Sequence, residues 1–393
     1  MEYRIEPPGP DVPVLLTPGP LTTSGDTKAA MLRDWGSRDT EFIAMTAEIR
    51  RRLLQLAGCP DGEFECVPVQ GSGTFAVESM LGTMVPRDGK ALVLANGAYG
   101  KRAAAILARI GRDHAVIDKG DYLPPLAADV DAALSADASI SHVVVIHCET
   151  SSGILNPLSD MAEVTRRHGR RLLVDSMSAF GAIPLDAGEV PFEAMVASSN
   201  KCLEGVPGFG FVIARTDALE QAEGNCHSLS LDAHAQWQGF DRDGQWRFTP
   251  PTHVVAAFLQ ALRDHEREGG VVGRHARYSR NRDVLLGEMR RMGFETLLVD
   301  RWLSPIIVTF FSPADRRFDF NRFYQLIGQR GYLIYPGKLT AADSFRIGCV
   351  GHIDQDIIGG ACHAIEEALD ELGVADRSPP AERLAERQLL ERI

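Results

Sequence analysis

The sequence lacks the cysteine pattern of a cross-linked or zinc-binding protein. Its seven cysteines are odd in number, scattered, and never spaced as C-x-x-C, so neither a disulfide framework nor a metal site is expected. It also lacks long hydrophobic runs: no eighteen apolar residues occur together, and the opening MEYRIEPPGP has no basic start followed by an apolar stretch. We therefore expect a cytoplasmic protein with no membrane-spanning segment.

An excess of positive charge is missing as well. The 393 residues carry 53 Asp and Glu against 41 Lys and Arg, for a net charge of −12, which argues against nucleic acid or an anionic membrane as a partner. No repeat with a period of 20 to 50 residues is visible, so a solenoid or propeller is not supported. Hydrophobic residues make up 45% of the chain, enough for a sizeable buried core.

The first two-thirds of the chain alternates short apolar runs with longer amphipathic segments. Runs bounded by Gly, Asn or Asp indicate strands buried on both faces, and apolar residues at three-to-four-residue spacing indicate helices. Strands are expected at 91–95, 142–146 and 172–174, and helices at 41–56, 74–84, 101–110 and 161–168. This order predicts an α/β fold with a mostly parallel sheet.

The pattern changes beyond about residue 252. Two helices, at 255–268 and 274–292, are followed by a strand, helix, strand, strand, helix order with strands at 305–311, 333–335 and 345–350 and helices at 318–329 and 354–372. We expect a large domain at 1–260 that includes an N-terminal arm and a small α+β domain at 261–373. The remaining residues, 374–393, are expected to form a terminal tail or solvated helix.

A glycine-rich turn at 71–74 (GSGT) leads from a strand into a helix. Free backbone N–H groups and two hydroxyls meet there, as in an anion site for a phosphate; an ordinary turn with Ser72 or Thr74 as N-cap is the alternative. The turn also fits a loose dinucleotide fingerprint, but the strand at 91–95 runs into Asn96-Gly97 without the required acidic residue. A nucleotide-dependent enzyme or a non-catalytic binding protein thus remains a weaker alternative.

Two further residues complete a cofactor site. Asp175 ends the apolar strand LLVD, at the edge where open α/β sheets bind ligands, and Lys201 lies among small residues in SSNKC. Small neighbours leave room for a bulky group on the amine and for partial desolvation of its charge. A phosphate site, a carboxylate for a ring nitrogen and an amine for an imine are the contacts that pyridoxal phosphate needs.

The chain resembles the class V aminotransferase group of fold-type I pyridoxal phosphate enzymes over residues 15–372, in motifs that follow the same order. The most specific are LLTPGPLTTS (15–24), QGSGTFAVE (70–78), NGAYGKR (96–102), HCETSSGILNP (147–157), VDSMSAFGAIP (174–184), SSNKCLEGVPGFGFVIAR (198–215), QWRFTPPTH (245–253), YPGK (335–338) and FRIG (345–348). The resemblance implies a large domain with a seven-stranded type of sheet and a small C-terminal domain. Departures from the family pattern include Cys148, Leu203 and Glu204.

The resemblance also implies a role for each matching residue. Lys201 would be the Schiff-base lysine and Asp175 the partner of the pyridine nitrogen. Phosphate would be held by Ser72, Gly73 and Thr74, with Thr249 of the other subunit, while the ring would contact Tyr99, Met177 and Thr150. Arg346 would bind the acidic end of the substrate, and Thr22 and Thr23 are the candidates for selecting it.

The substrates expected from the resemblance are a small amine and a keto acid, used by a homodimer with shared active sites. The similarity favours an amine donor that carries a phosphonate and pyruvate as the acceptor. An enzyme of the alanine:glyoxylate or serine:pyruvate type, or a lyase of the same fold, is the alternative.

Overall fold

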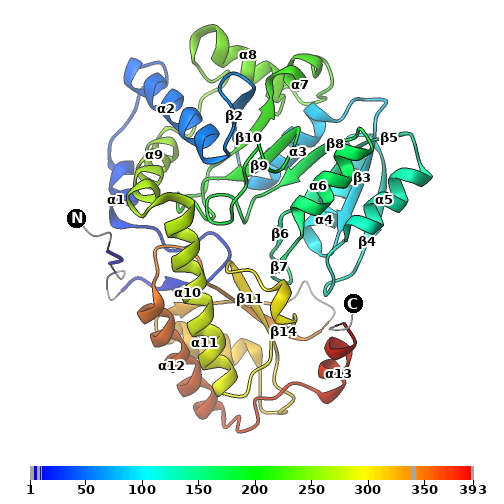
Figure 1. Cartoon of the computed structure of the whole chain (residues 1–393). Coiled ribbons are helices and arrows are strands. Elements are labelled where there is room, and N and C mark those ends of the chain that lie inside the picture. The colour runs from blue at the N-terminus through cyan, green and yellow to red at the C-terminus, as the bar shows by residue number, and fades with distance from the viewer. Residues whose placement is uncertain (1–3, 7–8, 10, 338–341, 391–393) are drawn as a thin grey trace.

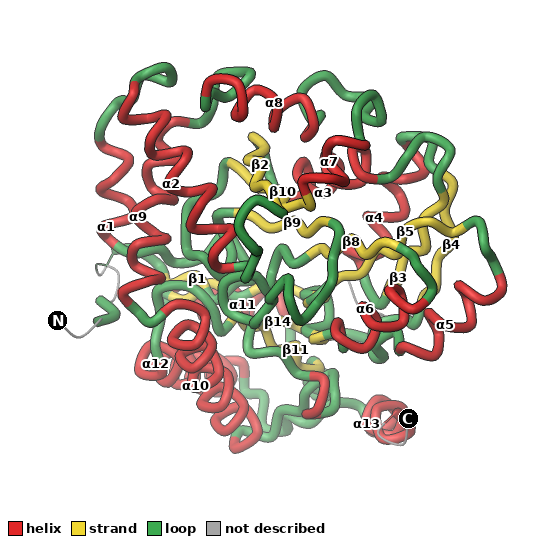
Figure 2. Tube along the Cα trace, turned by 45° about the horizontal axis from the view of Figure 1, so that its top comes forward, coloured by secondary structure: helices red, strands yellow, loops and turns green. Residues whose placement is uncertain are grey.

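A seven-stranded mixed sheet forms the centre of the larger part of the molecule (Figures 1 and 2). The computed structural model describes residues 4–6, 9, 11–337 and 342–390. The strand order is β2-β10-β9-β8-β5-β3-β4, and β10 alone runs antiparallel to its neighbours. The strands are β2 (Phe64–Gln70), β3 (Lys90–Ala95), β4 (Asp113–Asp118), β5 (Ile140–Ile146), β8 (Arg171–Asp175), β9 (Ala194–Ser198) and β10 (Phe209–Arg215). The predicted mostly parallel sheet is confirmed.

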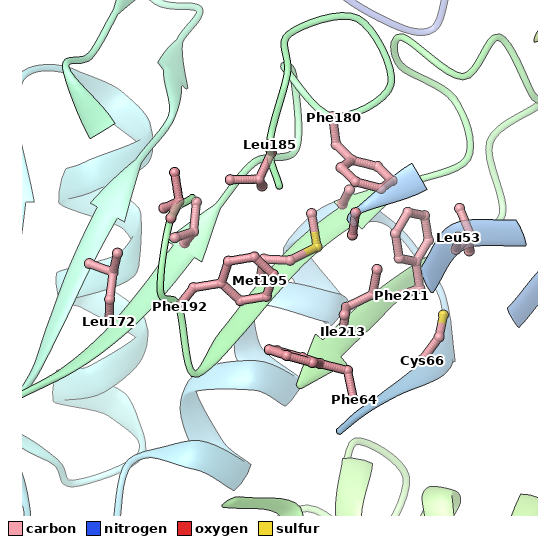
Figure 3. Packing of buried hydrophobic residues seen from close by; sticks show 14 of the residues in the cluster. Leu53, Phe64, Cys66, Leu172, Phe180, Leu185, Phe192, Met195, Phe211 and Ile213 are labelled. Carbon is pink, nitrogen blue, oxygen red and sulfur yellow. The ribbon is translucent and has the colours of Figure 1, made fainter. Parts of the chain in front are cut away.

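Helices cover both faces of this sheet. Because side chains alternate along a strand, Leu92 and Leu94 of β3 pack into one hydrophobic layer, while Ala91 and Val93 pack into the other. The first layer, part of which is drawn in Figure 3, is completed by α2 (Thr40–Leu56), α5 (Ala127–Ala136), α6 (Leu158–Arg167) and α9 (Thr252–Arg267). The second is completed by α3 (Gly73–Met84), α4 (Ala98–Arg109), α7 (Thr216–Gln221) and α8 (Ala233–Asp243).

The carboxyl ends of the parallel strands meet at one edge of the sheet. There, α3 begins three residues after β2 ends, α4 begins three residues after β3 ends, and β8 ends at Asp175. The short hairpin β6 (Cys148–Glu149) and β7 (Ile154–Leu155) follows β5 at the same edge. Helix N-termini and polar strand ends therefore converge on one region, which is where ligands bind in such sheets.

A smaller three-stranded antiparallel sheet lies below the large sheet in Figure 1. Its order is β11 (Ile307–Phe311), β14 (Ser344–Gly348) and β13 (Tyr335–Pro336), and its core is shared with α10 (Gly270–Arg291), α11 (Phe320–Gln329) and α12 (Gln355–Leu372). The strand expected at 333–335 is divided: β12 (Tyr332–Leu333) pairs with the N-terminal β1 (Val14–Leu15), whereas β13 pairs with β14. This long-range partner is invisible to local sequence patterns.

The chain passes from the core of the large sheet to the core of the small sheet along α9 and α10. Helix α9 contributes to the core of the large sheet, whereas the last turns of α10 contribute to the smaller core. The expected domain boundary between residues 260 and 261 remains a prediction. The remaining elements are α1 (Gly25–Ala29), η1 (Ala30–Leu32), η2 (Asp300–Trp302) and α13 (Ala381–Leu390).

Part of the expected tail is a docked helix. Arg387 of α13 donates to Glu295 (3.0 Å) and to the carbonyl of Thr296 (2.7 Å). These hydrogen bonds hold α13 against the segment that precedes β11. The last three residues and Lys338 of the YPGK motif lie outside the described residues. Within the described part, no helix is long and apolar enough to cross a membrane.

Candidate active site

A cavity of about 220 Å³ opens at the carboxyl edge of the large sheet. It brings together seven of the residues singled out from the sequence: Ser72, Gly73, Thr74, Tyr99, Asp175, Met177 and Lys201. The other lining residues are Gly19, Val77, Arg102, Ala103, Asn200, Pro207 and Gly208. Segments up to 189 residues apart in the chain thus form one site.

Asp175 is a buried carboxylate at the end of β8. Its Oδ1 accepts a hydrogen bond from the backbone N–H of Met177 (3.0 Å). Burial raises its pKa to about 6; this hydrogen bond opposes the increase, and the nearby charge of Glu149 adds to it. A buried carboxyl that resists ionisation gains from a cationic partner, which would restore its charge.

Lys201 follows β9 and its amine lies in the same cavity. Lys201 Nζ donates to the carbonyl oxygen of Gly19 (3.1 Å). Burial lowers the pKa of Lys201 to about 8, although Asp175 partly offsets the effect. Gly19 has a φ of +122°, and a Cβ there would lie 2.8 Å from Nζ, so only glycine lets the N-terminal arm approach the amine this closely.

The N-terminus of α3 is the place at which the anion site is expected. Ser72 occupies the N-cap position, but its hydroxyl makes no capping hydrogen bond, so the ordinary N-cap alternative is not what this turn does. The first N–H groups of the helix and this hydroxyl remain available to a phosphate. Gly73 packs closely against Met177, and a Cβ there would lie 2.5 Å from Sδ of Met177 and would displace that side chain.

Tyr99 and Arg102 form the wall of the cavity on α4. The guanidinium of Arg102 lies 4.8 Å from the ring centroid of Tyr99, and its Nη1 donates to Thr74 Oγ1 (3.1 Å). The buried carboxylate of Glu149 accepts from the backbone N–H groups of Tyr99 (3.1 Å) and Gly100 (3.3 Å). This contact orients the first turn of α4 and hence the aromatic ring.

Arg346 lies on β14, across from the hairpin that contains Thr150. Its Nη1 donates to the carbonyl of Thr150 (2.7 Å), and its Nε and Nη2 donate to the carbonyl of Pro336 (3.2 and 3.1 Å). No carboxylate within the described ranges forms an ion pair with it. A guanidinium has five N–H donors, so two remain for an acidic ligand, and burial lowers the pKa of this arginine.

Five predicted residues do not line this cavity: Thr22, Thr23, Thr150, Thr249 and Arg346. The hydroxyl of Thr22 accepts from the backbone N–H of Leu15 (2.8 Å), and Thr23 is buried beside it. Both side chains therefore pack within the N-terminal arm. Their placement does not support the expectation that they face the substrate. Thr249 is exposed on the surface, outside the cavity of its own chain.

Sequence reasoning missed Arg102 and Glu149. Arg102 had a usable signal, because it lies one helical turn after Tyr99 and so shares its face of α4. Glu149 had none, since its contact joins segments far apart in the chain. His147 pairs with Ser176 Oγ (3.0 Å), and burial lowers its pKa to about 4.

The donor set fits pyridoxal phosphate. A helix N-terminus with an unused Ser72 hydroxyl suits the phosphate, and the buried Asp175 suits a protonated ring nitrogen. Thr150 Oγ1 is fully buried without a hydrogen-bond partner in the described chain, which suits the ring hydroxyl. No group of three or more His, Cys, Asp or Glu that could hold a metal ion is found in the described part of the chain.

The fold and this site are those of an aminotransferase: residues 24–311 match the aminotransferase class-V family, and the chain belongs to that family. Pyridoxal 5′-phosphate is the cofactor that this membership implies. The chain is 62% identical to a 2-aminoethylphosphonate–pyruvate transaminase of Rhizobium meliloti, covering 96% of this chain and 99% of that one. It is 59% identical to a second such transaminase, from Paraburkholderia xenovorans, covering 96% and 97%.

Solved structures support the same fold at low sequence identity. Ureidoglycine-glyoxylate aminotransferase from Bacillus subtilis matches with a TM-score of 0.85 and 18% identity, over 97% of this chain and 98% of that one. At this identity the match shows the fold alone.

Proposed function

We propose that this enzyme transfers the amino group of 2-aminoethylphosphonate to pyruvate, which gives phosphonoacetaldehyde and alanine, with Lys201 and Asp175 as its catalytic residues. The observation that carries the proposal is the shared cavity in which a partly desolvated lysine, a buried carboxylate and a phosphate-binding helix N-terminus meet. The substrate assignment draws on the transaminases that are 59% and 62% identical over nearly the whole chain.

Bound pyridoxal phosphate would supply an electron sink that acidifies the carbon bearing the substrate amine. Lys201 would hold the cofactor, and its Nζ would move the proton that leaves that carbon. The pKa of the Lys201 amine is about 8, close to neutral pH, so the amine can both accept and donate a proton. Asp175 would ionise beside a cationic partner and would hold the ring nitrogen in its protonated form.

Arg346 binds the acidic group of each substrate in turn. Its two remaining N–H donors match two oxygens of either a phosphonate or a carboxylate. A phosphonate carries a third oxygen and more charge. Arg102 lines the cavity without a carboxylate partner in the described residues and supplies a second positive charge, in place of the loop hydroxyls of Thr22 and Thr23.

The enzyme acts as a homodimer in which Thr249 reaches the phosphate site of the neighbouring subunit. Two large apolar side chains are exposed on the surface near Thr249 and the start of α3. Phe75 is 51% exposed in the first turn of α3, and Phe248 is 47% exposed next to Thr249. Both line a surface groove of about 320 Å³ that also contains Gly71. Exposed apolar residues clustered beside a binding site are typical of an interface.

A panel of amine donors tests the proposed substrate. Alanine formation from pyruvate is measured with 2-aminoethylphosphonate and with serine as donors, and glycine formation from glyoxylate is measured with alanine as the donor. The proposal requires fast turnover with 2-aminoethylphosphonate and pyruvate. Turnover with serine, or with alanine and glyoxylate, in the absence of any with the phosphonate would assign the enzyme to the alternative types.

A further inference from the structure

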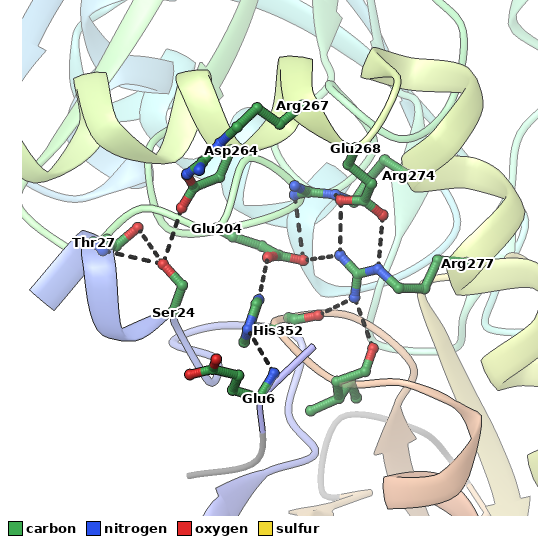
Figure 4. Close-up of polar contacts among 12 residues, drawn as sticks. Glu6, Ser24, Thr27, Glu204, Asp264, Arg267, Glu268, Arg274, Arg277 and His352 are labelled. Carbon is green, nitrogen blue, oxygen red and sulfur yellow. Dashed lines mark hydrogen bonds and ion pairs between the residues drawn. The ribbon is translucent and has the colours of Figure 1, made fainter. Parts of the chain in front are cut away.

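Figure 4 shows a buried cluster of charges that includes Glu204, Glu268, Arg274 and Arg277. Glu204 Oε1 accepts from Arg277 Nη2 (2.7 Å) and Tyr278 Oη (2.6 Å), and it lies 3.2 Å from Arg274 Nη1. Glu268 pairs with Arg274 Nε (2.6 Å) and Arg277 Nε (2.7 Å). Two carboxylates thus neutralise two guanidiniums, and all four side chains are at most 7% exposed.

The charge balance makes Glu204 indispensable to the cluster. Burial would raise the pKa of Glu204, but the charges of Arg274 and Arg277 outweigh it and lower the pKa to about 2. Loss of one carboxylate would leave two buried guanidiniums with a single partner, which is unfavourable in a low-dielectric interior. The cluster therefore behaves as one unit.

One end of the cluster holds the lysine loop. The backbone N–H of Glu204 donates to the carbonyl of Lys201 (2.8 Å), and Arg274 Nη1 donates to the carbonyl of Cys202 (2.5 Å). Among the described residues, Glu204 is the one non-glycine residue with a positive φ, +56°. This backbone conformation is strained for a non-glycine residue, and glycine would adopt it without that strain.

The other end holds the segment that follows Arg346. Arg277 Nη1 donates to the carbonyls of Gly351 (2.6 Å) and Ile353 (2.7 Å). Tyr278 Oη, which donates to Glu204, also accepts from the backbone N–H of Gly351 (3.2 Å). Gly351 lies five residues after Arg346, three beyond the end of β14. The Tyr278 hydroxyl therefore links the loop that carries Lys201 to the segment that follows the strand of Arg346.

We propose that Glu204 is a positioning residue: through Arg277 and Tyr278 it fixes the Lys201 amine relative to the Arg346 guanidinium. A substrate held by its acidic group must present one carbon to the amine, so the separation of these two groups decides whether proton transfer is possible. Misplacement by about 1 Å can cost on the order of a hundredfold in rate. The inference rests on the proposed roles of Lys201 and Arg346.

Glu204→Gly and Glu204→Gln test the carboxylate. Glycine adopts the positive φ without strain but removes the side chain, whereas glutamine keeps an oxygen that can accept from Tyr278. We expect Glu204→Gly to lower kcat by roughly tenfold to a hundredfold with KM changed by less than about threefold, and Glu204→Gln to recover part of that loss. The pH midpoint of the lysine-bound cofactor's visible absorbance should also move in Glu204→Gly.

Glu193→Gln is the matched control. Glu193 is 6% exposed and pairs with His142 (3.1 Å) and Arg171 just before β9, at the opposite end of that strand from Lys201. Its variant should lose thermal stability while kcat and the absorbance midpoint stay at the wild-type values. Comparison of the two glutamates separates positioning from a general loss of stability.

Tyr278→Phe is the milder variant if Glu204→Gly does not fold. It removes only the hydroxyl between Glu204 and Gly351, and we expect kcat to fall by about threefold to tenfold with a moved absorbance midpoint. Wild-type kcat and midpoint in Tyr278→Phe and in Glu204→Gln would overturn the inference. Lys201→Ala is measured in parallel, because wild-type turnover in that variant would instead reject the proposed function.

Discussion

Asp175→Asn should stabilise the enzyme without its cofactor at pH 8. In the folded chain burial raises the pKa of Asp175 from 3.8 to about 6. Between about pH 4 and pH 6, Asp175 is protonated in the folded state but already ionised in the unfolded state. The free energy of unfolding therefore falls as the pH rises through that range. Asparagine keeps an oxygen for the Met177 N–H but never ionises.

The size of the effect follows from the pKa difference. A difference of about 2 in pKa corresponds to about 3 kcal/mol at about 1.36 kcal/mol per pH unit. This penalty is complete above pH 6 and absent below about pH 4. At roughly 2 °C per kcal/mol for a large chain, the variant should melt about 6 °C higher than wild type at pH 8.

Differential scanning calorimetry of both proteins, freed of pyridoxal phosphate, at pH 4, 6 and 8 measures this difference. We expect the two melting temperatures to converge at pH 4 and to separate at pH 8, while the variant loses most of its transaminase activity. An equal or lower melting temperature of Asp175→Asn at pH 8, or a difference that persists unchanged at pH 4, would refute the reasoning.

Four further outcomes are expected. Lys201→Ala should retain cofactor only non-covalently and lose turnover by at least about 10³-fold, measured in steady state; near-normal turnover would reject the assignment. Arg346→Ala should slow both half-reactions by about 10²-fold in single-turnover assays, and a loss confined to one of them would contradict a shared acid site. Thr22→Val should cost about 1 kcal/mol of stability without changing the preference for phosphonate over alanine, because its hydroxyl binds Leu15; a selective loss of the phosphonate would return Thr22 to the substrate site. Pyridoxal phosphate should strengthen self-association in ultracentrifugation, and Thr249→Ala should weaken both association and cofactor affinity; a fully active monomer would exclude the shared site.

The large sheet could be predicted because its signals are local. Apolar runs bounded by Gly, Asn or Asp mark the strands, and the helix at 74–84 begins one residue earlier in the structure, at Gly73. The helix expected at 101–110 begins at Ala98. Its first turn is held by Glu149 from a distant hairpin, and no periodicity of apolar residues reports such a contact.

The site could be predicted where a residue ends a strand, and not where two distant segments meet. Asp175 and Lys201 follow apolar strands, so the geometry of a parallel sheet brings them to one edge. The sheet geometry does not determine where the hydroxyls of Thr22 and Thr23 in the N-terminal arm lie. Thr22 bonds within the arm, and Gly19 contacts the amine instead. The Glu204 cluster was hidden because Glu204, in the lysine loop, lies 73 residues before Arg277 of α10 in the chain.

Borohydride trapping at Lys201 tests the central claim most directly. Reduction of the resting enzyme, followed by peptide mapping, should place the pyridoxyl label on Lys201. Prior incubation with 2-aminoethylphosphonate should abolish the label, and subsequent pyruvate should restore it, because the amine is transferred and then passed on. A label on another lysine, or one that persists with 2-aminoethylphosphonate yet disappears with serine, would contradict the account.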